Sequence, residues 1–410
     1  MAEDFPRKVD DITNEWLSTV LGGTVTGYAA EYLEGGVLSD AFKLYAITYD
    51  GKSDVAPSSV VVKLASRVKD IRSFAVMGNA YTKELNFYQH LAKDVPINSP
   101  KVHGCFSDGS AGSEFFIIVM EDLTTHSKVF DQVDDPPNEA FARKIALEAA
   151  KLHATFWESD TTRLPWVGRD DNRYVFPLDA MSKMGNTTWA PFRALWAQMY
   201  GSDLFDRETF KPVEELTELL CGPQGVALHE KIYDVLSSRP KTLLHGDMKG
   251  DNIFRTHPAV CTSVEHAALT FIDWQLLHAG PPGPELTQAW QWTLELEDRR
   301  NDKDMLKQYR DKLVELNPAA AAYTYDMLLE DYTLSYCFWW TACISVGVGT
   351  LPSFAKPEAA RMKQLWGKSL FRGLSAMRDL DCLSLIKRLA ADLPDASSVA
   401  ASAVGKPWAE

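Results

Sequence analysis

The sequence predicts an α+β protein in two parts, with a strand-rich first third and a mainly helical remainder. Short runs of β-branched and aromatic residues fill the first part, and its last apolar run, residues 115–120, ends abruptly at Glu121. Beyond that point apolar residues recur at helical spacing. We therefore expect one unit at 1–121, a larger unit at 122–392 and an Ala- and Ser-rich tail at 393–410.

Apolar spacing and turn residues mark each element of the first part. We expect a helix at 10–20, strands at 25–33, 41–49, 60–64 and 115–120, and a helix at 80–91. Gly35-Gly36 and Asp50-Gly51 are turn signals next to these strands.

The second part is organised differently. We expect an amphipathic helix at 140–157, an irregular aromatic-rich segment at 160–212, two helices within 213–237, short strands at 242–244 and 270–272, and a series of helices from Glu285 onward. The two helices within 213–237 are separated by Gly222-Pro223, a pair that interrupts helical periodicity.

Charge and cysteine content exclude several classes of protein. With 42 Lys and Arg against 56 Asp and Glu, the 410-residue chain has a formal charge of −14. A nucleic-acid binder usually carries a basic stripe, so we expect no nucleic-acid partner. The six cysteines form no Cys-x-x-Cys pair, which favours core residues in a reducing compartment. The N-terminus shows no apolar run typical of a signal peptide, and we expect a cytoplasmic protein.

One segment is long enough to cross a bilayer. Residues 332–355 carry no charged side chain. They do contain many Thr, Ser and Gly residues and a Pro, which is unusually polar for a lipid-facing helix. We therefore expect a buried helix and no membrane span.

The sharpest chemical signal is a polar loop between two apolar runs. His245-Gly-Asp247-Met-Lys249-Gly-Asp-Asn252 follows Leu243-Leu244, and a second apolar run further on ends in Asp273. Phosphoryl transfer needs such a set, in which one Asp orients the attacking hydroxyl and accepts its proton. An Asn and a second Asp hold the metal that neutralises the phosphates.

The first part supplies a matching cation. Lys63 interrupts an apolar strand, where an unpaired charge would be costly, so it needs a carboxylate partner. Glu84 lies on the polar face of the next helix and is the candidate. The Gly35-Gly36 turn, followed by Ser39, would bring backbone N–H groups near phosphate oxygens.

These residues resemble the aminoglycoside phosphotransferase and choline kinase-like superfamily, and within it the ecdysteroid kinase-like branch. The resemblance covers residues 30–380 and rests on His245-Gly-Asp247-x-x-x-x-Asn252, Ile272-Asp273-Trp274-Gln275, Lys63, Glu84, Met120-Glu121-Asp122-Leu123 and Lys151–Trp157.

The resemblance implies a protein-kinase-like fold, with a small sheet lobe, a large helical lobe, and ATP between them. The adenine would lie against the hinge at Glu121 to Leu123. By the same resemblance Asp247 is the catalytic base and Asn252 and Asp273 are Mg²⁺ ligands. Lys63, steadied by Glu84, would contact the α- and β-phosphates.

The chain departs from the family pattern at two positions. Lys249 stands where many small-molecule kinases carry another residue, and it is a candidate for stabilising the transferred phosphate. Glu285, after Gly280-Pro-Pro-Gly-Pro284, stands where an Asp is frequent. It either keeps a structural role or faces the substrate.

The expected activity is therefore ATP-dependent phosphorylation of a hydroxyl group on a small molecule, by direct in-line transfer. The acceptor pocket would be formed by the segment 160–212 and the helices after 285, with Trp189, Trp196 and Glu285 as candidate contacts. The acidic charge and the aromatic residues are compatible with an amine-bearing acceptor, and also with a sterol, a sugar or another alcohol.

Two other classes of function stay open. A kinase fold without turnover would act as a nucleotide-binding or scaffold module. A metal-dependent phosphohydrolase would use His245, Asp247, Asp251 and Asp273 as a two-metal cluster, although it would leave Lys63 and Glu84 without a role.

Overall fold

The structure, a computed structural model, describes residues 5–33, 38–51, 56–108, 114–168, 178–201, 207–291, 293–355 and 359–393. The Gly35-Gly36 turn lies outside these residues, as does the expected tail beyond Leu393. Side chains are not described for residues 178–186, 350 and 354–355.

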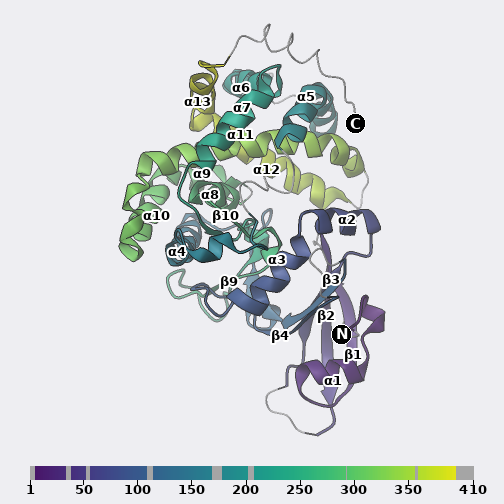
Figure 1. Ribbon diagram of the computed structural model, residues 1–410. Coiled ribbons are helices and arrows are strands. Elements are labelled where there is room, and N and C mark those ends of the chain that lie inside the picture. The colour runs from purple at the N-terminus through teal and green to yellow at the C-terminus, as the bar shows by residue number, and fades with distance from the viewer. Residues whose placement is uncertain are drawn as a thin grey trace, which may run out of the picture.

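Two lobes are seen in Figure 1, and the α+β expectation is confirmed. The smaller lobe is a five-stranded antiparallel sheet in the order β1-β2-β3-β5-β4. Its strands are β1 (Val25–Leu33), β2 (Ser39–Tyr49), β3 (Val60–Ala65), β4 (Val102–Ser107) and β5 (Phe116–Glu121). Its helices are α1 (Asn14–Leu21), α2 (Lys69–Met77) and α3 (Ala80–Asn86), the last continuing into a π-helical turn at Phe87–Leu91.

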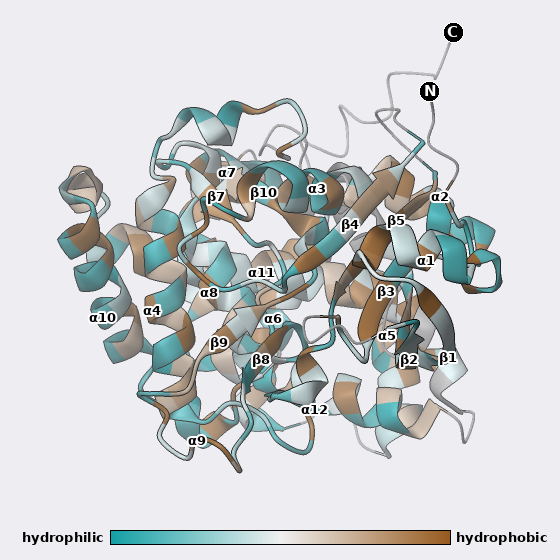
Figure 2. Ribbon diagram, turned by 90° about the horizontal axis from the view of Figure 1, so that it is seen from below, coloured by the Kyte–Doolittle hydropathy of each residue, from teal (hydrophilic) through white to brown (hydrophobic). Residues whose placement is uncertain are grey.

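The alternation of side chains along β3 sets the two faces of this sheet. Val60, Val62 and Leu64 pack with Leu17 of α1 in one apolar cluster. The intervening Lys63 points to the opposite face, because successive strand residues alternate. β3 is central, with Lys63 paired to Ala41 of β2 and Ile118 of β5. The hydrophobic colour in Figure 2 follows the strands of this sheet, whereas α2 is mostly hydrophilic.

The larger lobe is mainly helical. Its helices are α4 (Glu139–Thr155), α5 (Leu178–Tyr200), α6 (Lys211–Cys221), α7 (Gly225–Ser237), α8 (Pro282–Gln291), α9 (Leu296–Arg299), α10 (Asp302–Leu316), α11 (Tyr325–Thr350), α12 (Ala360–Asp379) and α13 (Cys382–Ala390). Its short strands are β6 (Ser127–Val129), β7 (Thr242–Leu244), β8 (Ile253–Thr256), β9 (Leu269–Phe271) and β10 (His278–Gly280). β7 pairs with β10, and β8 lies between β6 and β9.

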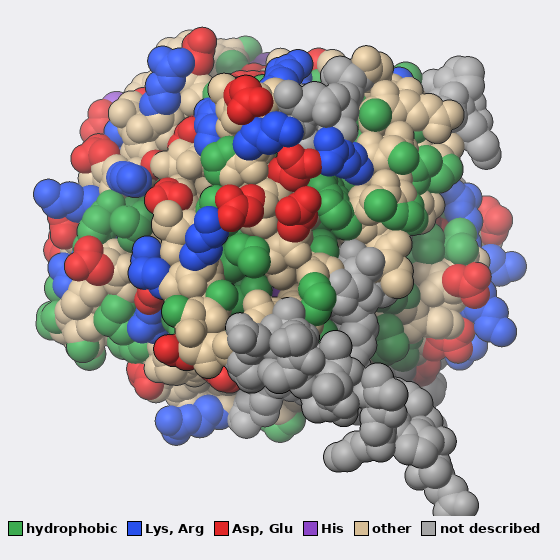
Figure 3. All heavy atoms as spheres, turned by 90° about the horizontal axis from the view of Figure 1, so that it is seen from above, with side chains coloured by type: hydrophobic (Ala, Val, Ile, Leu, Met, Phe, Trp, Pro, Cys, Tyr) green, Lys and Arg blue, Asp and Glu red, His purple; other side chains and the backbone are tan. Residues whose placement is uncertain are grey.

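The uncharged segment at 332–355 forms most of α11, whose residues are largely buried in the helical core. None of the described helices is long and apolar enough to span a bilayer. The surface seen in Figure 3 carries Lys and Arg side chains intermingled with Asp and Glu side chains, rather than separated by sign.

The expected irregular segment at 160–212 is the main error of the sequence-based prediction. It contains α5, a helix of 23 residues with Pro191 inside it. Trp189, Phe192, Trp196 and Tyr200 recur at intervals of three and four along it. Proline is a strong local sign of a loop, and here the packing of the aromatic stripe outweighs that sign.

A pair of aromatic rings joins the two lobes next to the cleft. Phe87, at the end of α3, stacks on Trp274 of the larger lobe with ring centroids 3.8 Å apart and planes at 10°. Both rings are fully buried. Phe87 lies three residues after Glu84 and Trp274 follows Asp273, so this stack holds together the two segments that carry these carboxylates.

We predict that Gly283→Ala lowers the melting temperature, because α8 and α11 touch at this glycine. A Cβ there would lie 2.6 Å from Cβ of Asp331 and 2.7 Å from N of Tyr332. Overpacking of this kind costs about 1–3 kcal/mol. Gly349→Ala, on α11, is the control. Its Cβ would meet nothing within 4 Å, so helix propensity should leave stability unchanged or slightly higher. Equal melting temperatures for the two variants would contradict the close packing.

Candidate active site

The ammonium group of Lys63 lies where the two lobes meet, a region called the cleft below. Its Nζ lies 2.8 Å from Oε1 of Glu84 on α3 and 2.9 Å from Oδ1 of Asp273, which follows β9 in the larger lobe. Lys63 and Glu84 are buried, while about a third of the Asp273 side chain, 32%, is exposed. The predicted Lys63–Glu84 pair is therefore present, and Asp273 joins it.

Electrostatics favour the charged forms of Lys63 and Asp273. Burial by itself would lower the pKa of Lys63, but Asp273 and Glu84 outweigh it and raise that pKa. Burial raises the pKa of Glu84, against the effect of Lys63. Burial would also raise the pKa of Asp273, but the Lys63 ammonium holds it below its ordinary value. Asp273 is thus the more firmly ionised of the two carboxylates.

The polar loop after β7 begins with a sharp turn. Gly246 has φ of 85°, and a Cβ at this position would lie 2.1 Å from the carbonyl oxygen of Leu276. Only glycine fits here without strain. His245 is buried and binds the carbonyl oxygen of Ile272 through Nε2 at 2.9 Å, while its Nδ1 accepts from the Asp247 backbone N–H. His245 therefore braces the loop.

Two donors hold the Asp247 side chain. Nζ of Lys249 lies 2.8 Å from its Oδ2, and Nδ2 of Asn252 lies 2.9 Å from the same oxygen. Nδ2 of Asn252 also donates to the backbone carbonyl of Asp247 at 2.9 Å. Burial would lower the pKa of Lys249, but Asp247 and neighbouring carboxylates raise it, so Lys249 stays cationic.

A backbone hydrogen bond joins the loop to the segment of Asp273. The N–H of Ile272 donates to the carbonyl oxygen of Asn252 at 3.0 Å, which brings Asn252 and Asp273 to the same end of the cleft. Asp273 has φ of 67° and ψ of 66°, a left-handed conformation that Asp tolerates better than most residues.

A hydrogen bond between Ser39 and Gln275 joins strand β2 of the small lobe to the larger lobe. Nε2 of Gln275 donates to Oγ of Ser39 at 3.1 Å, and both residues are buried. The neighbouring Gln275 amide also acts to lower the pKa of Glu84 against the effect of burial. Ser39 is therefore joined through Gln275 to the segment of Asp273, and its expected approach to phosphate oxygens stays a prediction. The contact of Gln275 was not foreseen, although its position two residues after Asp273 was a signal.

The expected hinge follows β5. The Glu121 side chain accepts from the Lys101 backbone N–H and from Nε2 of His126, and Leu123 is buried. Asp122 between them is buried as well and lies 2.9 Å from Nζ of Lys43 on β2. This ion pair fastens the sheet to the start of the larger lobe.

Glu285 lies in the interior, 1% exposed. Its Oε2 accepts from the backbone N–H of His245 at 2.5 Å, and its Oε1 accepts from that of Gly246 at 3.0 Å. Nε2 of His153 lies 3.7 Å from Oε2. Since both oxygens serve the loop, this placement corrects the expectation of a substrate contact. Burial would raise the pKa of Glu285, but His153 and His245 lower it.

The two tryptophans expected at the acceptor pocket pack within the helical lobe. Trp196 is buried against Phe192 and Tyr200. Trp189, half-buried, contacts Trp340 of α11 edge-on. This packing gives no support to a role for either ring as an acceptor wall.

The donor set at the cleft fits a hard divalent cation. The amide nitrogen of Asn252 points to Asp247, which leaves its oxygen for a ligand, and Asp273 is ionised and part-exposed. Mg²⁺ is commonly held by one or two such groups plus substrate phosphates. Among the described residues, no group of three His, Cys, Asp or Glu side chains is placed to hold a metal alone.

The sequence matches the family described as "Phosphotransferase enzyme family" over residues 54–316, well over half of the chain. The chain belongs to this phosphotransferase family. The matched region contains Lys63, Glu84, Asp247, Asn252 and Asp273. The sequence matches none of the curated proteins with which it was compared.

Similar solved structures come from several phosphotransferases. A choline kinase from Streptococcus pneumoniae is 14% identical, with a TM-score of 0.44, 88% of this chain covered and 97% of that one. An ethanolamine kinase from Plasmodium vivax is 14% identical, with a TM-score of 0.40 and coverages of 85% and 84%. An aminoglycoside-3'-phosphotransferase of type VIII is 17% identical, with a TM-score of 0.37 and coverages of 75% and 93%. Similarities this distant carry no conclusion about the acceptor.

We predict that Glu285→Gln destabilises the protein by about 1–3 kcal/mol at neutral pH, because one of the two backbone donors loses its acceptor in a buried place. The pKa of Glu285 is lowered in the folded state from 4.5. Its contribution is therefore full above that pH and is lost as the pH falls further. Melting curves of the two proteins should differ most at neutral pH and converge in acid. The exposed Glu297→Gln is the control, and a constant difference at all pH values would refute the assignment.

Proposed function

We propose that the protein transfers the γ-phosphoryl group of ATP to a hydroxyl group of a small molecule. The observation that carries this proposal is that two polar clusters lie side by side: the N–H of Ile272, next to Asp273, donates to the carbonyl oxygen of Asn252, and, against the effect of burial, the charge of Lys249 helps to lower the pKa of Asp273. Lys63, Glu84 and Asp273 form one cluster, and Asp247, Lys249 and Asn252 form the other. Membership of the phosphotransferase family supports the reaction type, and these six residues are the candidates to perform it.

Asp247 is the base in this proposal. Lys249 and Asn252 both bind its Oδ2, so we assign Oδ1 to the acceptor hydroxyl. The hydroxyl oxygen attacks the γ-phosphorus while the bond from phosphorus to the bridging oxygen of ADP breaks. The hydroxyl proton passes to Asp247. Lys249, released from Asp247 toward the phosphoryl group, would stabilise the charge on the transferred oxygens.

The nucleotide would lie under the sheet. Lys63 would contact the α- and β-phosphates, held by Glu84, and the backbone from Glu121 to Leu123 would receive the adenine. Asn252 and Asp273 would hold Mg²⁺, which when bound neutralises phosphate charge. Glu84 holds the Lys63 ammonium at 2.8 Å, which would position it for the phosphates.

The acceptor is a small alcohol, and an amine-bearing one is compatible with the acidic net charge of −14. The segments Met120–Leu123 and Lys151–Trp157 support assignment to the ecdysteroid kinase-like branch. Against a phosphohydrolase with a four-residue metal cluster, His245 is engaged with Ile272, and the Asp251 carboxylate is engaged with Gln132. A silent kinase fold is the remaining alternative, and measured turnover would exclude it.

We expect Asp247→Ala to lower turnover by about 10²–10⁴-fold, the usual contribution of a general base. Binding of Mg²⁺-ATP, measured by calorimetry, should change little. Phosphorylated product is followed by mass shift over a panel of small alcohols. Asp234→Ala, which changes an exposed carboxylate on α7, should behave as wild type. Unchanged turnover in Asp247→Ala would exclude this residue as the base.

We expect Asp273→Asn to abolish stabilisation by Mg²⁺-ATP. At about 100 times its dissociation constant, a ligand adds roughly 2.7 kcal/mol to the stability of the folded state. Melting temperatures are compared with and without Mg²⁺ and ATP, and the asparagine keeps the shape of the residue it replaces. The proposal fails if wild type shows no rise with any nucleoside triphosphate but does rise with metal alone.

A further inference from the structure

The loop from Asp247 to Asn252, called the catalytic loop below, is also attached to another part of the larger lobe. Asp251 lies between Gly250 and Asn252, and its carboxylate receives two hydrogen bonds from Gln132. The backbone N–H of Gln132 lies 3.2 Å from Oδ1, and its Nε2 lies 2.6 Å from Oδ2. Gln132 is buried, 3% exposed. It belongs to the segment between β6 and α4, residues 130–138, which we call the Gln132 loop.

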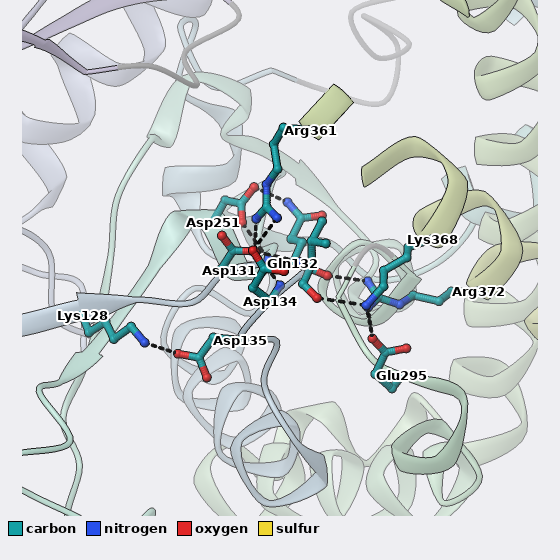
Figure 4. Close-up of polar contacts among 11 residues, drawn as sticks. Lys128, Asp131, Gln132, Asp134, Asp135, Asp251, Glu295, Arg361, Lys368 and Arg372 are labelled. Atoms are coloured by element: carbon teal, nitrogen blue, oxygen red, sulfur yellow. Dashed lines mark hydrogen bonds and ion pairs between the residues drawn. The ribbon is translucent and has the colours of Figure 1, made fainter. Parts of the chain in front are cut away.

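Helix α12 holds the Gln132 loop from behind (Figure 4). The guanidinium of Arg372 donates from Nη1 to the carbonyl oxygen of Gln132 at 3.0 Å and pairs through Nη2 with Glu295 at 2.6 Å. Lys368, one turn earlier, donates to the carbonyl of Val133 at 2.9 Å and also binds Glu295 at 3.1 Å. Arg372 is 1% exposed, so its charge is almost wholly withdrawn from water.

The contacts form a continuous path from α12 to the catalytic loop. Arg372 binds the carbonyl group of Gln132, and the N–H and side-chain amide of the same residue bind Asp251. Asp251 precedes Asn252, whose amide nitrogen holds Oδ2 of Asp247. A buried arginine with its partners is costly unless the hydrogen bonds are well made, and removing one partner is strongly destabilising. These hydrogen bonds therefore favour one arrangement of the path, and through Asp251 they constrain the position of Asn252.

We propose that Arg372 and Gln132 are positioning residues that act through Asp251 to set the catalytic loop from Asp247 to Asn252. They do not touch the reacting atoms. Their effect on turnover rests on the proposed function, whereas their effect on the geometry of the loop does not. Helix α12, outside the matched family region of 54–316, thereby becomes part of the catalytic apparatus.

The first test is a double-mutant cycle. Arg372→Met removes the donor to Gln132, and Asp251→Asn places an amide against one of its two donors. Each variant should lower kcat by about 10- to 100-fold, since small displacements of catalytic groups have effects of this size. The KM for ATP should change little. Because both changes break one path, the kcat of the double variant should lie within about twofold of the kcat of the less active single variant. Effects that multiply would overturn the proposal.

The control comes from the same helix. Arg378 is on α12 and pairs with its neighbour Asp379, not with the Gln132 loop. Arg378→Met should keep the kcat of wild type, and a loss equal to that of Arg372→Met would refute a specific path. If Arg372→Met fails to fold, Gln132→Met takes its place, because it removes only the Nε2 donor to Asp251.

The second test needs no turnover. Hydrogen exchange of the unliganded protein, followed by mass spectrometry, reports opening of the backbone at residues 245–253. Arg372→Met and Gln132→Met should both speed exchange in this segment, and Arg378→Met should not. If these two variants exchange faster but wild type has no kinase activity, the proposed function is refuted and the path is supported. Unchanged exchange, with activity present in wild type, would sink the path alone.

Discussion

The arrangement of the cleft depends on one ammonium group placed between two carboxylates. A buried cation is expensive unless it is paired, so Lys63 can stay on the inner face of β3 only while Glu84 and Asp273 remain within hydrogen-bonding distance. These residues come from a sheet, a helix and the far lobe. The same charge balance that allows Lys63 to be buried therefore also fixes how the lobes meet, and the stack of Phe87 on Trp274 maintains that contact.

The catalytic loop shows a second use of buried charge. Glu285 and Asp251 are carboxylates whose oxygens accept hydrogen bonds from other groups of the protein. Glu285 binds the start of the loop at His245 and Gly246, and Asp251 fixes its end next to Asn252. Asp247 lies between these anchors. A side chain held from both sides has little conformational freedom left to lose on binding, which is a form of preorganisation.

The sequence was sufficient for features set by neighbouring residues and insufficient for those set by distant ones. The strand at 25–33 was predicted with its observed bounds because alternation and turns are local. The lysine inside an apolar strand predicted its own partner, since an unpaired charge there is costly. Gln132 and Asp251 are 119 residues apart, and Arg372 and Gln132 are 240 apart, so their contacts appear only in the folded chain. The helix α5 was missed because Pro191 locally signals a loop.

The backbone at Asp273 restricts how this protein can change over generations. Its left-handed conformation, with φ of 67°, suits glycine, asparagine and aspartate far better than other residues. Only one of these three is anionic. Glutamate, the other acidic residue, lacks the short side chain that stabilises this conformation through local hydrogen bonds. Asparagine and glycine are each one nucleotide change away from aspartate, and either would preserve the turn while discarding the charge. A lineage can thus lose this carboxylate in a single step and preserve the turn, while losing one of the two carboxylates that pair with the ammonium group of Lys63.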